Sequence, residues 1–202
     1  MLEGRKKMDQ KAVIDFFNRL APGWDAETIR NEDAIRIILD NAGIRAGIDV
    51  LDVACGTGVL FPDYIARGVV SLTGIDIAPE MASRAQAKFP QAEVICGDVE
   101  VYPFGRQFDV VMVYNAFPHF PDPQRLIERF AALVKPGGRL SVAHGMSREM
   151  LTRHHSGAAS KVSIGLIDEQ ELAALFKPWF DVDVVISNDR FYQVAGSRKA
   201  KQ

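Results

Sequence analysis

The sequence has little cysteine and no long apolar run. Its 202 residues include two cysteines, Cys55 and Cys96, and neither stands in a CxxC pair or a metal-like spacing. A disulfide framework is therefore not expected. No run of 18 apolar residues occurs, so no transmembrane helix is expected. The charged N-terminus lacks the apolar core of a secretory signal, which predicts a cytoplasmic protein. Met8 is a possible natural start, with residues 1–7 as an addition.

The sequence also lacks an excess of positive charge. It carries 24 Lys and Arg against 26 Asp and Glu, a formal net charge of −2. Neither a nucleic acid nor a membrane surface is an expected partner, because both usually attract a basic surface. The 48% hydrophobic and 25% charged residues are typical of a globular protein. The length suits one ordinary domain.

Short β-rich runs alternate with helical patterns, as in α/β folds. We expect a Rossmann-like, doubly wound sheet of seven strands, mostly parallel, with an antiparallel C-terminal hairpin at its edge. Residues 1–47 are predicted to form a helical lid and residues 48–202 the core. Residues 145–167 fit neither pattern. The predicted strands cover 48–53, 70–75, 92–96, 108–114, 139–143, 182–187 and 191–196; the predicted helices cover 10–20, 32–41, 59–67, a segment from Pro79, 123–134 and 168–176. A turn is predicted at Pro136-Gly137-Gly138.

The stretch "VLDVACGTGVL", residues 50–60, reads as a strand that ends in a glycine turn and passes into a helix. Such a turn directs backbone N–H groups at a ligand, and glycine allows the ligand to approach the backbone closely. The dinucleotide fingerprint G-x-G-x-x-G would need a third glycine at position 61, where this sequence has Phe61. The absence of that glycine argues against a nicotinamide dinucleotide.

Two acidic residues follow the next two predicted strands. Asp76 closes the second strand, and a carboxylate there can accept hydrogen bonds from both hydroxyls of a ribose. Asp98 follows the third strand, where a carboxylate can accept from an exocyclic amine such as that of adenine. Together with the glycine turn, they describe a ligand with an amino-acid-like end, a ribose and an adenine, which is S-adenosylmethionine (SAM).

Five motifs in this order resemble the class I SAM-dependent methyltransferases, in particular the methyltransferase type 11 group. They are "VLDVACGTG" (50–58), "GIDIAPEM" (74–81), "CGDVE" (96–100), "FDVVMVYNAF" (108–117) and "LVKPGGRL" (133–140). The resemblance implies an enzyme that transfers the methyl group of SAM to a small-molecule acceptor by in-line displacement. It also implies a set of cofactor-binding residues: Asp52, Ala54, Gly56, Gly58, Asp76, Ile77, Met81, Asp98, Val99 and Asn115. Relatives use the N-terminal region, which here contains Trp24, to close over the cofactor.

All four histidines, His119, His144, His154 and His155, fall near the edge where parallel strands end. Three interpretations stay open. The histidines are ordinary loop residues, or His119, His144 and His154 include a general base, since imidazole titrates near neutrality. The third interpretation, a metal site made of all four, has the least support because no H-x3-H spacing occurs. We therefore expect no metal.

Two other functions remain as alternatives, a nicotinamide-dependent reductase on a related sheet and a SAM-binding module without catalytic activity. The acceptor is expected to be a small molecule, because the sequence lacks both the N/D-P-P-Y/F signature of nucleobase amino-methylating enzymes and the double-glutamate loop of protein-arginine methyltransferases. Apolar residues follow the fourth and fifth strands and could line its pocket: Phe117, Phe120, Met146 and Met150. A monomer or a homodimer is expected.

Overall fold

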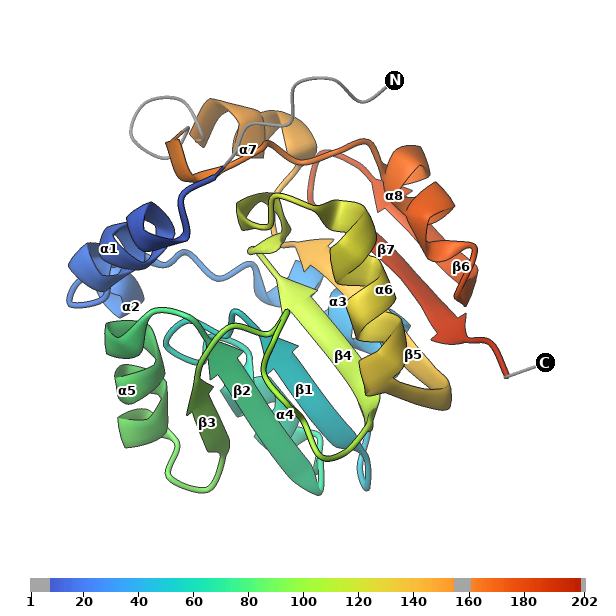
Figure 1. The fold of residues 1–202 in the computed structure, drawn as a ribbon, viewed down its shortest axis with the longest axis horizontal. Helices are drawn as coiled ribbons and strands as arrows, with labels where there is room; N and C mark the ends of the chain where they lie inside the picture. The colour runs from blue at the N-terminus through green and yellow to red at the C-terminus, as the bar shows by residue number, and fades with distance from the viewer. Residues whose placement is uncertain (1–7, 155–160, 201–202) are drawn as a thin grey trace.

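A computed structural model describes residues 8–154 and 161–200. Its centre is a seven-stranded sheet in the order β3-β2-β1-β4-β5-β7-β6 (Figure 1). Strands β1 to β5 run parallel, and β7 runs antiparallel to both β5 and β6. This confirms the predicted fold class, including the C-terminal hairpin at the edge. The strands are β1 (Asp49–Val53), β2 (Ser71–Asp76), β3 (Glu93–Cys96), β4 (Phe108–Tyr114), β5 (Val134–His144), β6 (Phe180–Ser187) and β7 (Tyr192–Arg198).

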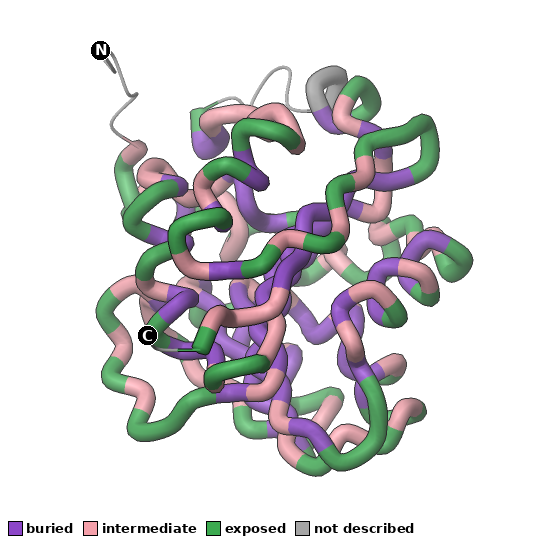
Figure 2. Tube along the Cα trace, turned by 90° about the vertical axis from the view of Figure 1, so that its right-hand side faces the viewer, coloured by how far each residue is buried: buried purple, intermediate pink, exposed green. Residues whose placement is uncertain are grey.

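Helices cover both faces of the sheet, which makes three layers. On one face, α6 and α8 pack on β1, β4, β5 and β7; on the other, α3 and α4 pack against the opposite side of β1 and β4. The buried residues form a continuous interior between these layers (Figure 2). The helices are α1 (Gln10–Leu20), α2 (Trp24–Glu27), α3 (Glu32–Asn41), α4 (Phe61–Ala66), α5 (Pro79–Lys88), α6 (Pro123–Leu133), α7 (Arg148–His154) and α8 (Glu169–Phe176), with a 3₁₀ turn at Phe117–His119.

Strand β1 shows why the sequence folds in this way. Leu51 and Val53 join the cluster under α6, whereas Val50 joins the cluster under α3 and α4. Alternating side chains of one strand therefore meet apolar residues on both faces, which is the condition of a central parallel strand. No helix within the described ranges is long and apolar enough to cross a membrane.

The predicted turn at Pro136-Gly137-Gly138 is wrong, because these residues lie inside β5. The pairing of β4 with β5 shifts there, from Phe108 opposite Val134 to Val110 opposite Arg139. Gly137 has a φ of 75°, and a Cβ at Gly138 would lie 2.7 Å from the carbonyl oxygen of Asp109. The glycines thus allow an irregularity within a paired strand, a role that composition alone does not separate from a turn.

Two segments for which no element was predicted contain helices. Part of the unassigned stretch 145–167 forms helix α7, and the segment after α1 adds the short helix α2. Helix α1 packs beside α5, where the backbone N–H of Glu80 donates to Asn18 Oδ1 at 3.0 Å. Both N-terminal helices therefore stand over the edge where the parallel strands end (Figure 1). We call α1, α2 and residues 28–31 the roof.

Candidate cofactor and acceptor site

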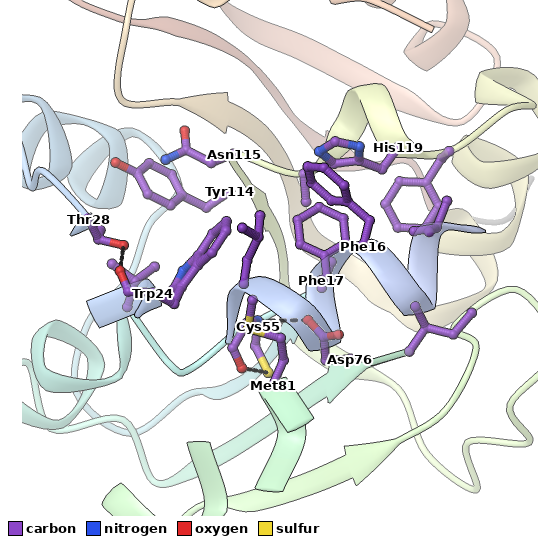
Figure 3. A pocket seen from close by; sticks show the side chains of 18 of the residues that line it. Phe16, Phe17, Trp24, Thr28, Cys55, Asp76, Met81, Tyr114, Asn115 and His119 are labelled. Atoms are coloured by element: carbon purple, nitrogen blue, oxygen red, sulfur yellow. Dashed lines mark hydrogen bonds between the residues drawn. The ribbon is translucent and has the colours of Figure 1, made fainter. Parts of the chain in front are cut away.

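A cavity of about 820 Å³ lies between the roof and the ends of the parallel strands (Figure 3). It receives residues from the segments that follow β1, β2, β3, β4 and β5. This is the edge at which open α/β sheets bind their ligands. Most of the predicted cofactor residues line the cavity: Ala54, Gly56, Asp76, Ile77, Met81, Asp98, Val99 and Asn115. Of the predicted catalytic residues with described side chains, His119 lines it and His144 does not.

Asp76 holds the glycine turn in place. Its Oδ2 accepts from the backbone N–H of Gly56 and its Oδ1 from that of Ala78, both at 2.8 Å. One carboxylate therefore ties the loop after β1 to the start of α5. Burial raises the pKa of Asp76 to about 6, although the two N–H donors counteract the rise. A carboxylate has about four acceptor positions, so Asp76 can also accept from the hydroxyls of a bound sugar.

The two glycines of the turn have different roles. Both have positive φ, 57° at Gly56 and 83° at Gly58. A Cβ at Gly56 would point toward the cavity, with the Trp24 indole nitrogen 3.8 Å away as its nearest neighbour. A Cβ at Gly58 would lie 3.0 Å from the rings of Phe61 and Phe89. Gly56 thus allows a ligand to approach, while Gly58 allows the loop to pack on aromatic rings below it.

Asp52 is almost completely buried and is not among the residues that line the cavity. It lies beneath the glycine turn beside the hydroxyl of Tyr64, in the layer that contains α4. Burial, together with the negative charge of Asp76, raises the pKa of Asp52 to about 8 against the opposing effect of the Tyr64 hydroxyl. The prediction that Asp52 lies near the amino group of the cofactor stays a prediction.

Asp98 and Val99 line the cavity from the segment that follows β3. Asp98 Oδ1 accepts from the backbone N–H of Glu100 at 2.9 Å, and its Oδ2 accepts from Gln10 Nε2 at 2.8 Å. Val99 is buried, and its carbonyl accepts from Arg129 Nε at 3.0 Å. Arg129, on α6, also donates to the carbonyl of Tyr102. The loop that carries Asp98 is therefore held in place by hydrogen bonds from helix α6.

Asn115 joins the ends of β4 and β5. Its backbone has a φ of 56°, its N–H donates to the carbonyl of Ala143, and its Oδ1 accepts from the N–H of Gly145, both at 2.9 Å. A positive φ is uncommon outside glycine, and asparagine is among the residues that tolerate it best. Figure 3 shows the Asn115 side chain beside the ring of Tyr114.

Sequence reasoning missed Tyr114 as a cavity residue. It reads as the last residue of an apolar strand, yet it lines the cavity, and burial raises its pKa to about 12. Gly145 makes room for its hydroxyl, since a Cβ at Gly145 would lie 2.1 Å from that oxygen. The sequence did contain two indications of this role, a tyrosine at the end of the strand and a glycine at position 145.

His119 has a defined orientation. Its Nδ1 lies 2.7 Å from the carbonyl oxygen of Val162. A carbonyl only accepts, so Nδ1 carries a proton and Nε2 is the acceptor nitrogen of the neutral ring. The ring also meets Phe17 of α1 edge-on, with centroids 4.9 Å apart. An imidazole held in this way at a cavity wall has the form that a general base requires.

The structure does not bring the histidines together where it describes them. His144 is fully buried at the end of β5, with its ring edge-on to Tyr192. The His154 side chain and the whole of His155 lie outside the described residues. Among the described side chains, no group of three or more His, Cys, Asp or Glu is placed to hold a metal ion. A role for His154 or His155 stays a prediction.

The roof is attached to the core by polar contacts that the sequence did not reveal. Asp25 accepts from Lys88 Nζ, with both oxygens at 2.8 Å, and from the hydroxyl of Thr57. Arg30 donates to the carbonyl of Val59 and pairs with Asp63 at 2.8 Å. The inner side of the roof is mainly apolar and aromatic and contributes Val13, Phe16, Phe17, Leu20 and Trp24 to the cavity wall.

Residues 50–138 match the family model described as "Methyltransferase domain". The ribosomal protein L11 methyltransferase of Laribacter hongkongensis is 31% identical over 79% of this chain and 47% of its own length. The ubiquinone biosynthesis O-methyltransferase of Coxiella burnetii (strain Dugway 5J108-111) is 36% identical over 46% of this chain and 42% of its own. The chain thus spans about half the length of these relatives.

A solved structure shows the same fold. The N-methyltransferase NodS of Bradyrhizobium japonicum, in complex with S-adenosyl-L-homocysteine (SAH), superposes with a TM-score of 0.73 over 93% of this chain and 98% of NodS, at 12% identity. The matched segment, 50–138, contains the glycine turn, Asp76, Asp98 and Asn115, all of which the fold brings to one edge. The resemblance to the class I SAM-dependent methyltransferases drawn from the five motifs is thus confirmed, with residues 50–138 matching a methyltransferase domain.

Proposed function

We propose that this chain is an enzyme that binds SAM in the cavity and transfers its methyl group to a small-molecule acceptor. One observation carries the proposal: Gly56, Asp76 and Asp98, on the segments after three neighbouring strands, line a single cavity. An adenine at Asp98, a ribose at Asp76 and a methionine portion over the glycine turn would follow the order of these strands.

The remaining predicted residues take supporting roles in this proposal. Ile77, Met81 and Val99 supply apolar walls for the adenosine, and Ala54 and Asn115 face the methionine portion. Asp52 and Gly58 act from below, since the first lies under the glycine turn and the second lets the turn pack on Phe61 and Phe89. The cofactor supplies an activated methyl group on a sulfonium.

The acceptor would lie on the side of the cavity formed after β4 and β5. A lone pair on its oxygen, nitrogen or sulfur would attack the methyl carbon of bound SAM while the carbon–sulfur bond breaks, with that bond's electron pair left on sulfur. His119 Nε2 would take the proton of the acceptor. Much of the acceleration comes from alignment of the two reactants and exclusion of water, for which the roof is suited.

The residues on this side indicate an acceptor with an apolar or aromatic body. Phe120, Met146, Met150 and Leu151 line the cavity from these segments, and Phe16 lines it from the roof. Methionine side chains adapt to irregular shapes and make favourable contacts with aromatic rings. The name of the Coxiella relative, an O-methyltransferase of ubiquinone biosynthesis, supports an acceptor of this kind.

The proposal also covers setting and partners. We infer a cytoplasmic monomer or homodimer that needs neither a nucleic acid nor a membrane surface, in line with a net charge of −2. Light scattering of the purified protein measures the oligomeric state. Methyl transfer measured in buffer without nucleic acid or lipid tests whether either of these partners is needed.

The decisive experiment measures binding and then transfer. Thermal unfolding with SAM, SAH and NAD should show stabilisation by the first two and none by NAD. Methyl transfer from isotopically labelled SAM is then followed with a panel of phenols, thiols and amines. Stabilisation by NAD alone would favour a reductase. Tight SAM binding without transfer to any acceptor would favour a binding module without catalytic activity.

A further inference from the structure

The inner side of α1 carries one polar residue. Gln10, Val13, Phe17 and Leu20 line the cavity from this helix at a spacing of about one turn, and all but Gln10 are apolar. Gln10 is the first residue of α1 and meets Asp98, the residue at the adenine end of the proposed site. A glutamine placed there is therefore available to a purine as well as to Asp98.

Asp98 fixes the orientation of the Gln10 amide. The carboxylate can only accept, so the 2.8 Å contact with Asp98 Oδ2 identifies Nε2 as the donor. The amide is planar, and Oε1 must then occupy the other branch. Nε2 has a second hydrogen that the contact with Asp98 does not use, so Gln10 offers one donor and one acceptor side by side.

This pair matches one edge of adenine. The amide of glutamine can bind adenine through two hydrogen bonds, in which its oxygen accepts from the N6 amine and its nitrogen donates to N7. The second hydrogen of the N6 amine remains for Asp98, whose Oδ2 has a further acceptor position. Bound in this way, Gln10 and Asp98 lie on opposite sides of the N6 amine, so the adenine takes the place of the direct contact between their side chains.

Resting on the proposed function, we propose that Gln10 is a cofactor-binding residue that reads the N6–N7 edge of the adenine. Asp98 belongs to the core and Gln10 to the roof, separated by 88 positions in the chain. An adenine bound between Gln10 and Asp98 would connect the roof to the core at the N-terminal end of α1. The residue thus couples occupancy of the adenine site to closure of the cavity.

The test is calorimetric binding of SAH and of its 7-deaza analogue, in which a C–H group replaces N7. Gln10→Leu should weaken SAH binding about tenfold, the value expected for two lost hydrogen bonds. The wild type should bind the 7-deaza analogue several-fold more weakly than SAH, whereas Gln10→Leu should bind both equally. A residue with a purely structural role would not change this ratio.

Asn18→Leu is the matched control, because it removes another hydrogen bond between α1 and the core, the one from Glu80 N–H. It should keep the wild-type ratio between SAH and the 7-deaza analogue. If Gln10→Leu binds SAH as tightly as the wild type or more tightly, or keeps that ratio, the role of Gln10 is overturned while the cofactor site stands. A wild type that binds no SAH would overturn the proposed function itself.

Discussion

The two ends of the cavity are built in different ways. At the cofactor end, Asp76 and Asp98 each accept from a backbone N–H two positions further on, at Ala78 and Glu100. After β4, toward the proposed acceptor end, Asn115 meets Gly145, 30 positions away, and His119 meets Val162, 43 positions away. The first end thus combines local turns with long-range contacts to Gly56 and Gln10, whereas the pairs named at the second join segments that only the folded chain brings together.

A substitution of His119 should have the largest effect, because it should change methyl transfer without changing cofactor binding. His119→Ala should lower the rate of methyl transfer by about 10²- to 10⁴-fold, the usual contribution of a positioned base. SAH affinity should stay within about twofold, since other residues make the proposed cofactor contacts. Transfer from labelled SAM and calorimetry measure the two quantities on the same preparation.

His119→Asn separates the base from its tether. The asparagine amide can still donate to the carbonyl of Val162 but cannot take a proton from the acceptor. It should be as inactive as His119→Ala. An asparagine variant that keeps most of the activity would instead assign His119 to holding the segment around Val162.

The buried Asp52 predicts a pH effect of intermediate size. Its pKa is about 8 in the folded chain, above the ordinary value of 3.8. The folded chain therefore keeps a proton between pH 4 and pH 8 that the unfolded chain has lost, and stability must fall as the pH rises through that interval. We expect the unfolding free energy to drop by a few kcal/mol from pH 5 to pH 9, as measured by urea denaturation without cofactor.

Asp52→Asn should remove much of this decrease, because the amide has no charge to bury. Asp76 and Cys55 are the other titratable groups whose charges act on this part of the site, together with Tyr64. Asp49→Asn, at the opposite end of β1 and paired with Lys135 at 2.8 Å, serves as the control and should keep the decrease. Equal pH profiles for the wild type and Asp52→Asn would contradict the prediction.

The roof covers both ends of the cavity. Loss of the ion pair between Asp25 of the roof and Lys88 of the core should have the smallest effect on cofactor binding. Lys88→Ala removes the pair with Asp25, in which both side chains are partly exposed. Exposed pairs contribute about 0.2–1 kcal/mol, so SAH affinity should fall by no more than about fivefold. The loss should vanish at 1 M salt, where such charges are screened. Lys11→Ala breaks a pair with Asp15 within α1 and should have no effect on affinity.

The sequence predicted the sheet and most of the cofactor end because local rules govern both. The apolar run that contains Leu51 and Val53 predicted a buried strand. Asp76 at the end of β2 and Asp98 just after β3 could be located because the ends of those strands could be predicted. The same rules mistook Pro136-Gly137-Gly138 for a turn, since glycine favours bulges as well as turns. The role of Asp52 comes from the resemblance and not from these rules; the fold buries Asp52 next to Tyr64, outside the cavity lining, and its cofactor role stays a prediction.

The sequence by itself determined the alternation of strands and helices, the glycine turn and the acids that follow it, because these depend on residues within one or two turns of the chain. Only the tertiary structure decided that Gln10 meets Asp98, that Val162 orients His119, and that Gly145 makes room for Tyr114. Such contacts join segments far apart in the chain. Their partners are set by the packing of whole elements, which no local pattern of residues specifies.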